Sequence, residues 1–212
     1  WASRFPPFRM QSACRNGAGK MGKPCVGVLA LQGAFREHAA SVARLGAETR
    51  EVRQLKDMDG IDAMIIPGGE STTMGKLLVE WGMLDPLRQR IENGMPVYGS
   101  CAGLILLCRE IENSDQPRLG VLDAVVRRNA FGRQVDSFET ELDIPELGQP
   151  PIPAVFIRAP VLTGVGPRAR VLAQVNGQAV AVRQDNVLAT SFHPELTPDT
   201  RLHRYFLEMC GN

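Results

Sequence analysis

Residues 97–104 hold a cysteine in the pattern that hydrolases use to expose a nucleophile. Cys101 is the centre of Gly-Ser-Cys-Ala-Gly, with cysteine in the position where many hydrolases have serine. Glycine on each side removes a Cβ atom that would collide in a sharp strand-to-helix turn, and the N-terminus of the following helix favours the thiolate. The pattern predicts a thiol nucleophile; the alternative is a buried cysteine in a glycine-rich turn.

A thiol nucleophile needs a base, and the base needs a partner that orients it. Among the three histidines, His193 follows an apolar stretch, and Glu195 lies two residues later, where an extended chain points both side chains the same way. We therefore predict a triad of Cys101, His193 and Glu195; the alternative for His-Pro-Glu is a surface turn. His38 is expected at a solvated helical position, and His203 is expected to be exposed or to contact the C-terminal dipole of the last helix.

Attack on a carbonyl carbon also needs N–H donors for the oxyanion. Residues 67–73, Pro-Gly-Gly-Glu-Ser-Thr-Thr, follow a short apolar run and open a helical pattern, so their glycine N–H groups can face a pocket. We predict an oxyanion hole formed by Gly69 and by the N–H of Ala102, the residue after the nucleophile. The alternative, a phosphate loop, lacks the required spacing because leucine follows the Gly-Lys pair at 75–76.

Two arginine-containing segments could hold the carboxylate of a substrate. Residues 127–134 read Arg-Arg-Asn-Ala-Phe-Gly-Arg-Gln, and residues 156–160 read Phe-Ile-Arg-Ala-Pro. Guanidinium groups bind carboxylates through paired hydrogen bonds, whereas runs of charge are commonly solvated surface. The sequence leaves both interpretations open.

The elements that must position these residues alternate between strands and helices in the first half of the chain. Apolar runs predict strands at 25–31, 48–52, 63–66 and 97–99, and helical spacing predicts helices at 33–45, 71–79, 84–93 and 103–112. Gly46 suits the end of the first helix. The alternation predicts an α/β fold, with a mostly parallel central sheet and flanking helices.

The second half contains short β-like runs divided by Gly, Pro and Asn. We expect these additional strands at 121–127, 138–143, 155–157, 171–175, 179–183 and 187–191, and a final helix at 200–210. Asn176-Gly177 predicts a type I′ hairpin turn, which needs positive φ at both residues. We assign residues 25–212 to one domain and residues 1–24 to a flexible extension or a start-site artefact, since Met21 could open a natural chain.

Composition argues against several other classes of protein. The 212 residues are 44% hydrophobic and 22% charged, with a net charge of +1, which is ordinary for a globular protein and creates no field that attracts nucleic acid. No apolar run approaches the roughly 18 residues of a membrane span. The five cysteines include no Cys-x-x-Cys pair, so we expect a reducing compartment, the cytoplasm. No metal-ligand cluster or nucleotide site is evident, and no cofactor is expected.

Six motifs carry a resemblance to a known family. They are LALQGAFREH (29–38), PGGESTT (67–73), GSCAGLILL (99–107), RNAFGRQVDSF (128–138), FIRAP (156–160) and SFHPELTPDTRLH (191–203). Together they resemble the glutaminase subunits of pyridoxal 5′-phosphate synthase, which are class I (triad-type) glutamine amidotransferases. The resemblance implies a single-domain, flavodoxin-like glutaminase fold over residues 25–212. The departures are Ser100, where threonine is expected, and the loop at 149–153.

The resemblance also implies an activity and a partner. Cys101 attacks the side-chain amide of L-glutamine, His193 and Glu195 complete the triad, and glutamate is released. The residues implied to contact glutamine are Gly69, Glu70, Ser71, Arg128, Ile157 and Arg158. The ammonia passes to a separate synthase subunit of a hetero-oligomer, which builds the vitamin B6 cofactor from a pentose phosphate and a triose phosphate. The glutaminase is expected to be poorly active until it docks there, and neither nucleic acid nor a membrane is expected as a partner.

Two other functions stay open. The chain could be the glutaminase subunit of a different amidotransferase, which would differ only in the destination of the ammonia. It could also be a non-catalytic binding partner whose cysteine merely lines a pocket.

Overall fold

The computed structural model describes residues 23–128 and 137–211. Most of the predicted N-terminal extension, and the part of the arginine segment at 129–136, lie outside the described residues. Within the described part, no helix is long and apolar enough to cross a membrane.

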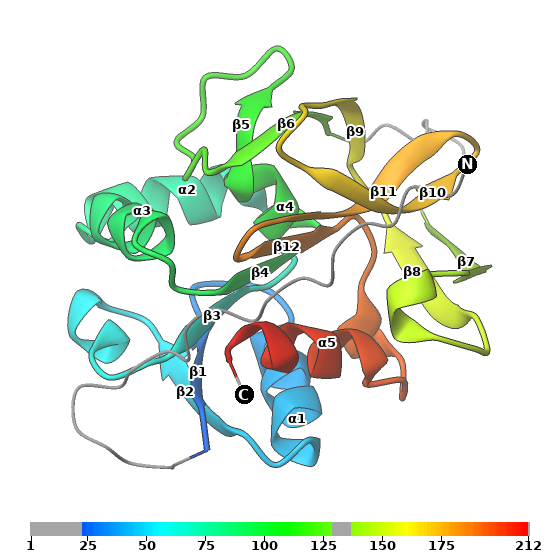
Figure 1. The fold of residues 1–212 in the computed structure, drawn as a ribbon. Coiled ribbons are helices and arrows are strands. Elements are labelled where there is room, and N and C mark those ends of the chain that lie inside the picture. The colour runs from blue at the N-terminus through cyan, green and yellow to red at the C-terminus, as the bar shows by residue number, and fades with distance from the viewer. Residues whose placement is uncertain (1–22, 129–136, 212) are drawn as a thin grey trace, which may run out of the picture.

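One large sheet runs through the structure (Figure 1). Its strands follow the order β2-β1-β3-β4-β12-β11-β9-β6-β5, with β10 paired to β11, and β7 and β8 form a separate antiparallel pair. The strands from β2 to β12 in this order are mutually parallel, whereas β11 and β9 are antiparallel to their neighbours. The bounds are β1 Cys25–Leu29, β2 Glu48–Val52, β3 Ala63–Ile66, β4 Val97–Ser100, β5 Cys108–Ile111, β6 Leu122–Arg127, β7 Ser137–Leu142, β8 Ile152–Ile157, β9 Val161–Val165, β10 Arg170–Val175, β11 Gln178–Gln184 and β12 Val187–Thr190.

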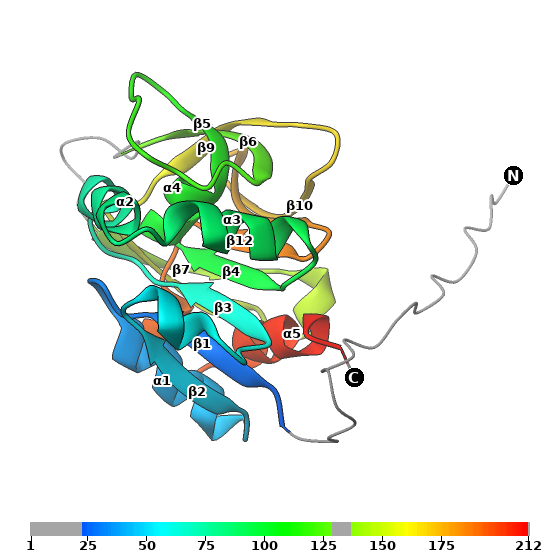
Figure 2. The same ribbon diagram turned by 90° about the vertical axis from the view of Figure 1, so that its left-hand side faces the viewer.

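Helices cover both faces of the sheet (Figures 1 and 2). The helix α1 (Phe35–Arg44) packs beside α5 (Arg201–Met209) on one face. On the other face α2 (Ser71–Glu80) contacts both α3 (Leu84–Glu92) and α4 (Ala102–Leu107). Short 3-10 turns lie at Leu55–Met58 (η1), Pro145–Leu147 (η2) and Pro194–Leu196 (η3).

Alternate residues of the central strands divide the core in two. On β3, Met64 belongs to the cluster that contains Leu78 of α2, whereas Ile65 belongs to the cluster that contains Val42 of α1 and Phe206 of α5. Successive side chains of a strand point to opposite faces, so the two clusters lie on opposite sides of one sheet. Both faces of the central strands are therefore apolar, which explains the continuous hydrophobic runs seen in the sequence.

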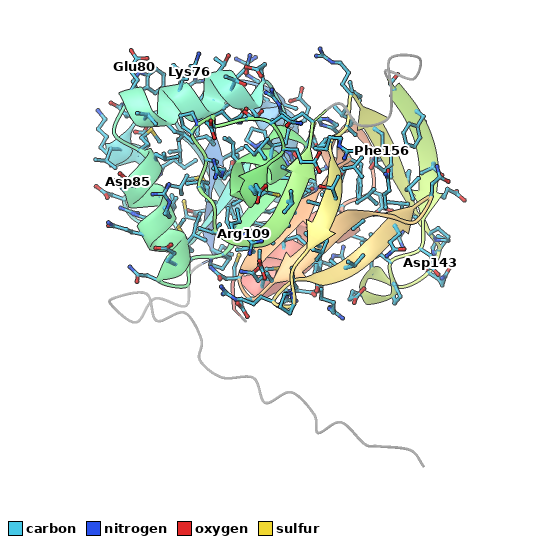
Figure 3. The ribbon with its side chains drawn as sticks, turned by 90° about the horizontal axis from the view of Figure 1, so that it is seen from above. Lys76, Glu80, Asp85, Arg109, Asp143 and Phe156 are labelled. Atoms are coloured by element: carbon cyan, nitrogen blue, oxygen red, sulfur yellow. The ribbon has the colours of Figure 1, made fainter. Side chains whose placement is uncertain are left out.

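Charged side chains of the helices point outward. Figure 3 shows Lys76 and Glu80 of α2 at the outer edge of the molecule, whereas Phe156 of β8 lies inside. Phe156 is 1% exposed and its ring stacks on that of Phe138 with 4.5 Å between centroids. The small β7–β8 sheet is held against the rest of the molecule through this aromatic side chain, because Phe156 also packs against Phe192.

Most predicted elements are confirmed, including two turns. Gly46 follows the end of α1 with a φ of 84°. Asn176 and Gly177 join β10 to β11 with φ values of 50° and 76°, the left-handed pair that a type I′ turn requires.

The predicted helix at 103–112 is wrong in its second half. The helix α4 ends at Leu107, and β5 begins at Cys108 and pairs with β6. Cys108 and Ile111 are buried while the two residues between them are exposed, a spacing of three that is typical of a helix and that concealed the strand. The strand β9 was not predicted, because glycine and proline interrupt its short apolar run at residues 160–166.

Candidate active site

Cys101 occupies a sharp turn between β4 and α4. Its backbone has φ 48° and ψ −101°, in the region that L residues rarely adopt. Its N–H donates to the carbonyl oxygen of Thr190 across 2.8 Å, which ties the turn to the end of β12. The side chain is 8% exposed.

The glycines around Cys101 permit close approach of the backbone. A Cβ atom on Gly103 would lie 2.0 Å from the carbonyl oxygen of Ile66 at the end of β3. A Cβ atom on Gly99 would lie 2.6 Å from the carbonyl carbon of Gly103. The Gly-x-Cys-x-Gly pattern is therefore required by the packing of β4, α4 and β3.

The parallel register brings His193 to the same edge of the sheet. Ser100 at the end of β4 pairs with Thr190 at the end of β12, so both chains leave the sheet side by side. The N–H of His193 donates to the carbonyl oxygen of Val155, and the carboxyl ends of parallel strands are where α/β proteins commonly bind ligands. A Cβ atom at Gly68 would lie 2.3 Å from Cε1 of His193, so the imidazole sits against bare backbone.

Glu195 orients the imidazole of His193. Oε1 of Glu195 lies 2.7 Å from Nδ1 of His193, and the carboxyl group is almost fully buried. Burial raises the pKa of Glu195, but the neighbouring imidazole of His38 and the hydrogen bond from His193 outweigh that effect and lower the pKa. The carboxylate is therefore ionised and accepts the Nδ1–H of His193.

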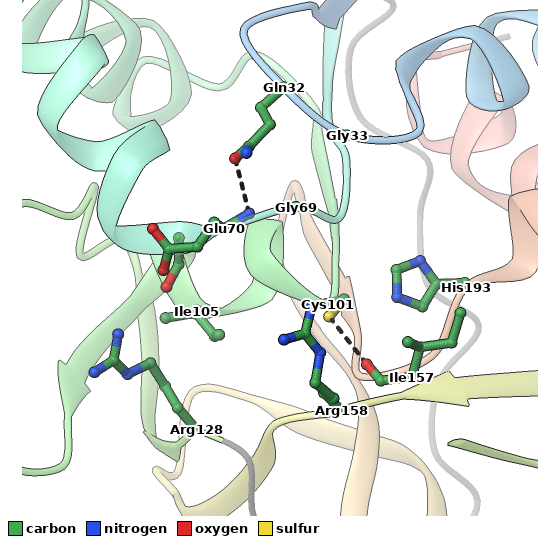
Figure 4. A pocket seen from close by; sticks show the side chains of 11 residues that line it. Gln32, Gly33, Gly69, Glu70, Cys101, Ile105, Arg128, Ile157, Arg158 and His193 are labelled. Carbon is green, nitrogen blue, oxygen red and sulfur yellow. Dashed lines mark hydrogen bonds between the residues drawn. The ribbon is translucent and has the colours of Figure 1, made fainter. Parts of the chain in front are cut away.

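His193 and Cys101 line the same pocket. Burial lowers the pKa of His193, but the neighbouring thiol of Cys101, the hydrogen bond to Glu195 and the negative charge of Glu195 together raise it to about 10. Figure 4 shows both side chains at the pocket, with Sγ of Cys101 also 4.0 Å from the carbonyl oxygen of Ile157. The imidazole can therefore accept the thiol proton and hold it near neutral pH.

A pocket of about 400 Å³ surrounds these groups. It is lined by Gln32, Gly33, Gly69, Glu70, Ser71, Cys101, Ile105, Arg128, Ile157, Arg158 and His193. Every residue that the sequence analysis associated with glutamine is in this set. Ala102 is not in it, but it is the first residue of α4, where a backbone N–H has no acceptor within the helix. Gln32, Gly33 and Ile105 were missed, although Gln32 and Gly33 follow a predicted strand, where such pockets form.

The two arginine segments separate into pocket and surface. Nη1 of Arg128 donates to Oγ1 of Thr72 at 2.9 Å and to Oε1 of Gln116 at 3.0 Å, which holds this side chain at the pocket. Arg158 lines the pocket with a φ of 41°. Arg127 instead forms an exposed ion pair with Glu112. Arg127 therefore fits the interpretation as solvated surface, and that Arg128 and Arg158 hold a carboxylate stays a prediction.

Glu70 stabilises the N-terminus of α2 beside the pocket. Its carboxylate accepts hydrogen bonds from the N–H groups of Thr72 at 3.2 Å and Thr73 at 2.8 Å, and so caps the N-terminus of α2. Burial raises the pKa of Glu70, but these hydrogen bonds outweigh it and lower the pKa. The N–H of Glu70 donates to Oε1 of Gln32, which joins the β3–α2 loop to the loop after β1. Among the described residues, no group of three His, Cys, Asp or Glu side chains could hold a metal ion.

Residues 28–212 match the SNO glutamine amidotransferase family. The chain belongs to this family. A pyridoxal 5′-phosphate synthase subunit PdxT from Carboxydothermus hydrogenoformans is 60% identical over 183 residues, which are 86% of this chain and 96% of that protein. PdxT from Moorella thermoacetica is 58% identical over 186 residues, 88% of this chain and 99% of that protein.

A solved structure gives the same result for the fold. The crystal structure of a glutamine amidotransferase superposes with a TM-score of 0.84 at 56% identity, covering 87% of this chain and 98% of that one. The fold class predicted from the sequence, that of the class I glutamine amidotransferases, is thereby confirmed.

In this glutamine amidotransferase the predictions for His38 and His203 are wrong. Both imidazoles are fully buried, and Nε2 of His38 lies 3.3 Å from Oε2 of Glu195. Helical spacing carried a signal: His38 precedes buried Val42 by four residues, and His203 precedes buried Phe206 by three. The charged neighbours of each histidine in the sequence concealed that signal.

Proposed function

We propose that this chain hydrolyses L-glutamine to L-glutamate and ammonia with Cys101, His193 and Glu195 as its catalytic triad. The chain is a glutaminase of the pyridoxal 5′-phosphate pathway, as its family and its PdxT relatives indicate. The observation that carries the assignment of the triad is local: Cys101, in a strained turn, shares a pocket with His193, which lies 2.7 Å from the Glu195 carboxylate. We assign this glutaminase domain to residues 25–212.

The reaction proceeds through two acyl-transfer steps. His193 accepts the thiol proton, and Sγ of Cys101 attacks the carboxamide carbon of glutamine. N–H groups of Gly69 and Ala102 stabilise the oxyanion, and protonated His193 gives its proton to the departing ammonia. A water molecule, deprotonated by His193, then hydrolyses the thioester and releases glutamate. The raised pKa of His193 supports its part as the acid in the first step.

The remaining pocket residues bind the substrate. Arg128 and Arg158 provide positive charge for the α-carboxylate of glutamine. Gly69, Glu70 and Ser71 contribute backbone and polar groups from the β3–α2 loop, and Ile157 supplies an apolar wall. Ile105, which the sequence did not suggest, contacts the same space.

The ammonia passes to a separate pyridoxal 5′-phosphate synthase subunit in a hetero-oligomer. The relatives support this step because they are themselves named as synthase subunits. We place the complex in the cytoplasm; the described cysteines, Cys25, Cys101, Cys108 and Cys210, are all free thiols, as a reducing compartment requires.

Substitution of the nucleophile tests the assignment. Cys101→Ala is expected to abolish glutamine hydrolysis, measured as glutamate formed in the presence of the synthase subunit, while binding to that subunit persists. Cys25→Ala is the matched control and is expected to keep full activity, because Cys25 lies on β1 outside the pocket. Turnover by Cys101→Ala would refute the triad.

A reagent and a partner assay separate the alternatives. An electrophilic diazo ketone analogue of glutamine is expected to label Cys101 stoichiometrically, and a chain that is merely a binding partner would not be labelled. Stimulation of glutaminase activity by the synthase subunit is expected here, and its absence would favour a different amidotransferase as the recipient of the ammonia.

A further inference from the structure

A second group of titratable side chains lies on the side of Glu195 that faces away from the pocket. Nε2 of His38 lies 3.3 Å from Oε2 of Glu195 and 2.9 Å from Oγ of Ser100. Nδ1 of His38 lies 3.0 Å from Nε2 of His203. His38, Ser100 and His203 are each 0% exposed, and none of them lines the pocket. We call these three residues the inner layer.

Both imidazoles of the inner layer are neutral. Burial lowers the pKa of His38 more than the nearby charge of Glu195 raises it. Burial and the neighbouring His38 lower the pKa of His203 to about 3. The ring of Tyr98 packs edge-on against both imidazoles, with centroid distances of 5.7 Å and 6.1 Å, so an aromatic wall closes this layer.

The ionised carboxylate fixes the direction of the hydrogen bonds. Nε2 of His38 faces Oγ of Ser100 at 2.9 Å and Oε2 of Glu195 at 3.3 Å. The hydroxyl can accept or donate but the carboxylate only accepts, so we assign the proton to Nε2, where both oxygens can share it. A neutral imidazole has one N–H, so Nδ1 of His38 accepts the Nε2–H of His203. This order leaves Nδ1 of His203 without a proton, and that atom is a buried nitrogen without a partner among the described residues. No N–H group of the inner layer is then buried without an acceptor.

We propose that His38 is a positioning residue for glutamine hydrolysis, whose Nε2–H holds the carboxylate of Glu195 so that Oε1 meets Nδ1 of His193. The inference rests on the proposed function of the triad. Oε2 of Glu195 is itself a buried oxygen without a hydrogen bond among the described residues, and Nε2 of neutral His38, which also contacts Oγ of Ser100, lies 3.3 Å from it. Without that N–H the carboxylate can rotate or take up a proton, and either change weakens its hold on His193.

Two amide substitutions of His38 distinguish a role in positioning Glu195 from a role in packing alone. The amide nitrogen of His38→Gln reaches the place of Nε2, whereas that of His38→Asn reaches only the place of Nδ1. With the synthase subunit present, we expect His38→Gln to keep kcat within about threefold of the parent, and His38→Asn to lower kcat about 10- to 100-fold with KM little changed. Equal kcat values for two folded variants, or a more active His38→Asn, would overturn the proposal.

Two controls accompany this pair. Val42→Ala removes a buried side chain one turn further along the same face of α1, and is expected to lower the free energy of unfolding without changing kcat. Cys101→Ala reports on the triad itself. If Cys101→Ala is inactive and His38→Asn fully active, the positioning role falls and the proposed function stands; if Cys101→Ala is active, the proposed function falls.

The tautomer of His38 provides a test on the unsubstituted protein, independent of whether any variant folds. The chain has three histidines, so ¹⁵N-histidine labelling gives a simple spectrum that His193→Asn helps to assign. We expect His38 to be neutral and protonated on Nε2 at pH 7. A neutral ring protonated on Nδ1, or an imidazolium, would overturn the proposal.

Discussion

The two sides of Glu195 are built on opposite principles. On the pocket side, Oε1 contacts His193, which lines a cavity of about 400 Å³ together with Cys101. On the inner side, Oε2 faces His38 in a layer that is fully buried. One side opens on a cavity lined by polar groups, and the other packs polar groups against each other away from that cavity. The difference teaches that a carboxylate that orients a base needs its own orientation fixed, and that the two requirements can be tested separately.

The largest effect on kcat is expected at Glu195, which contacts both sides. Glu195→Gln replaces an acceptor-only group by one whose amide can present its N–H to either imidazole, which favours the wrong tautomer of His193. We expect kcat to fall by at least about 10²-fold in the glutaminase assay with the synthase subunit; the same change in a serine-protease triad lowers kcat about 10⁴-fold. Glu208→Gln, on the exposed side of α5, is the control and is expected to have no effect. A fall of less than fivefold for Glu195→Gln would contradict the triad.

The pocket side could be predicted from the sequence, because its residues follow the predicted strands directly. Cys101 follows β4, the Gly68-Gly69 pair follows β3, and His193 follows β12 by three residues. Parallel strands deliver their carboxyl ends to one edge, so local patterns were enough to bring these residues together. The glutamine contacts needed the family resemblance in addition, since Arg158 lies in an irregular segment with a positive φ.

The inner layer could not be predicted in the same way. His38 belongs to α1 and His203 to α5, 165 residues apart, and their meeting depends on both helices covering the same face of the sheet. A histidine on an amphipathic helix beside charged neighbours fits a solvated position as well as a buried one. The buried position depends on a partner in the sheet, Ser100 at the end of β4, and no spacing within either helix reveals that contact.

On the pocket side, removing a charge should affect binding more than turnover. Arg128→Ala is expected to raise the KM for glutamine about 10- to 100-fold, because a hydrogen bond to a charged group contributes roughly 1.5–3 kcal/mol. Arg127→Ala is the matched control, since this exposed neighbour pairs with Glu112 and does not line the pocket. An equal change of KM for both variants would mean that general surface charge, rather than a contact with the substrate, attracts glutamine.

The tight backbone contact beneath Cys101 predicts a stability effect. Gly103→Ala would place a Cβ atom 2.0 Å from the carbonyl oxygen of Ile66, and overpacking of this kind costs about 1–3 kcal/mol. Gly164→Ala on β9 meets only Val125, at 3.5 Å, and is expected to be close to neutral. Urea unfolding of both variants measures the difference, and equal midpoints would show that the turn relaxes without cost.

The most gradual expected effect is in the pH dependence of stability, where the two sides should have opposite signs. The pKa of His193 is raised from 6.5 to about 10, so between these two pH values the folded chain holds a proton on His193 that the unfolded chain has lost. Its contribution is complete below pH 6.5 and is lost as the pH rises through 10. His203 has its pKa lowered from 6.5 to about 3, so its contribution is complete above pH 6.5 and is lost as the pH falls toward 3.

Two variants separate these contributions by the slope of the free energy of unfolding against pH. A packing defect lowers that free energy equally at every pH and leaves the slope unchanged. For each proton the free energy of unfolding changes by at most about 1.4 kcal/mol per pH unit. Relative to the parent, His193→Asn is expected to flatten the decline in stability between about pH 7.5 and 9.5, and His203→Gln the decline between about pH 6 and 4. If both substitutions flattened the decline in the same pH range, the two imidazoles would titrate together. The inner layer would then be an extension of the pocket rather than a separate support for Glu195.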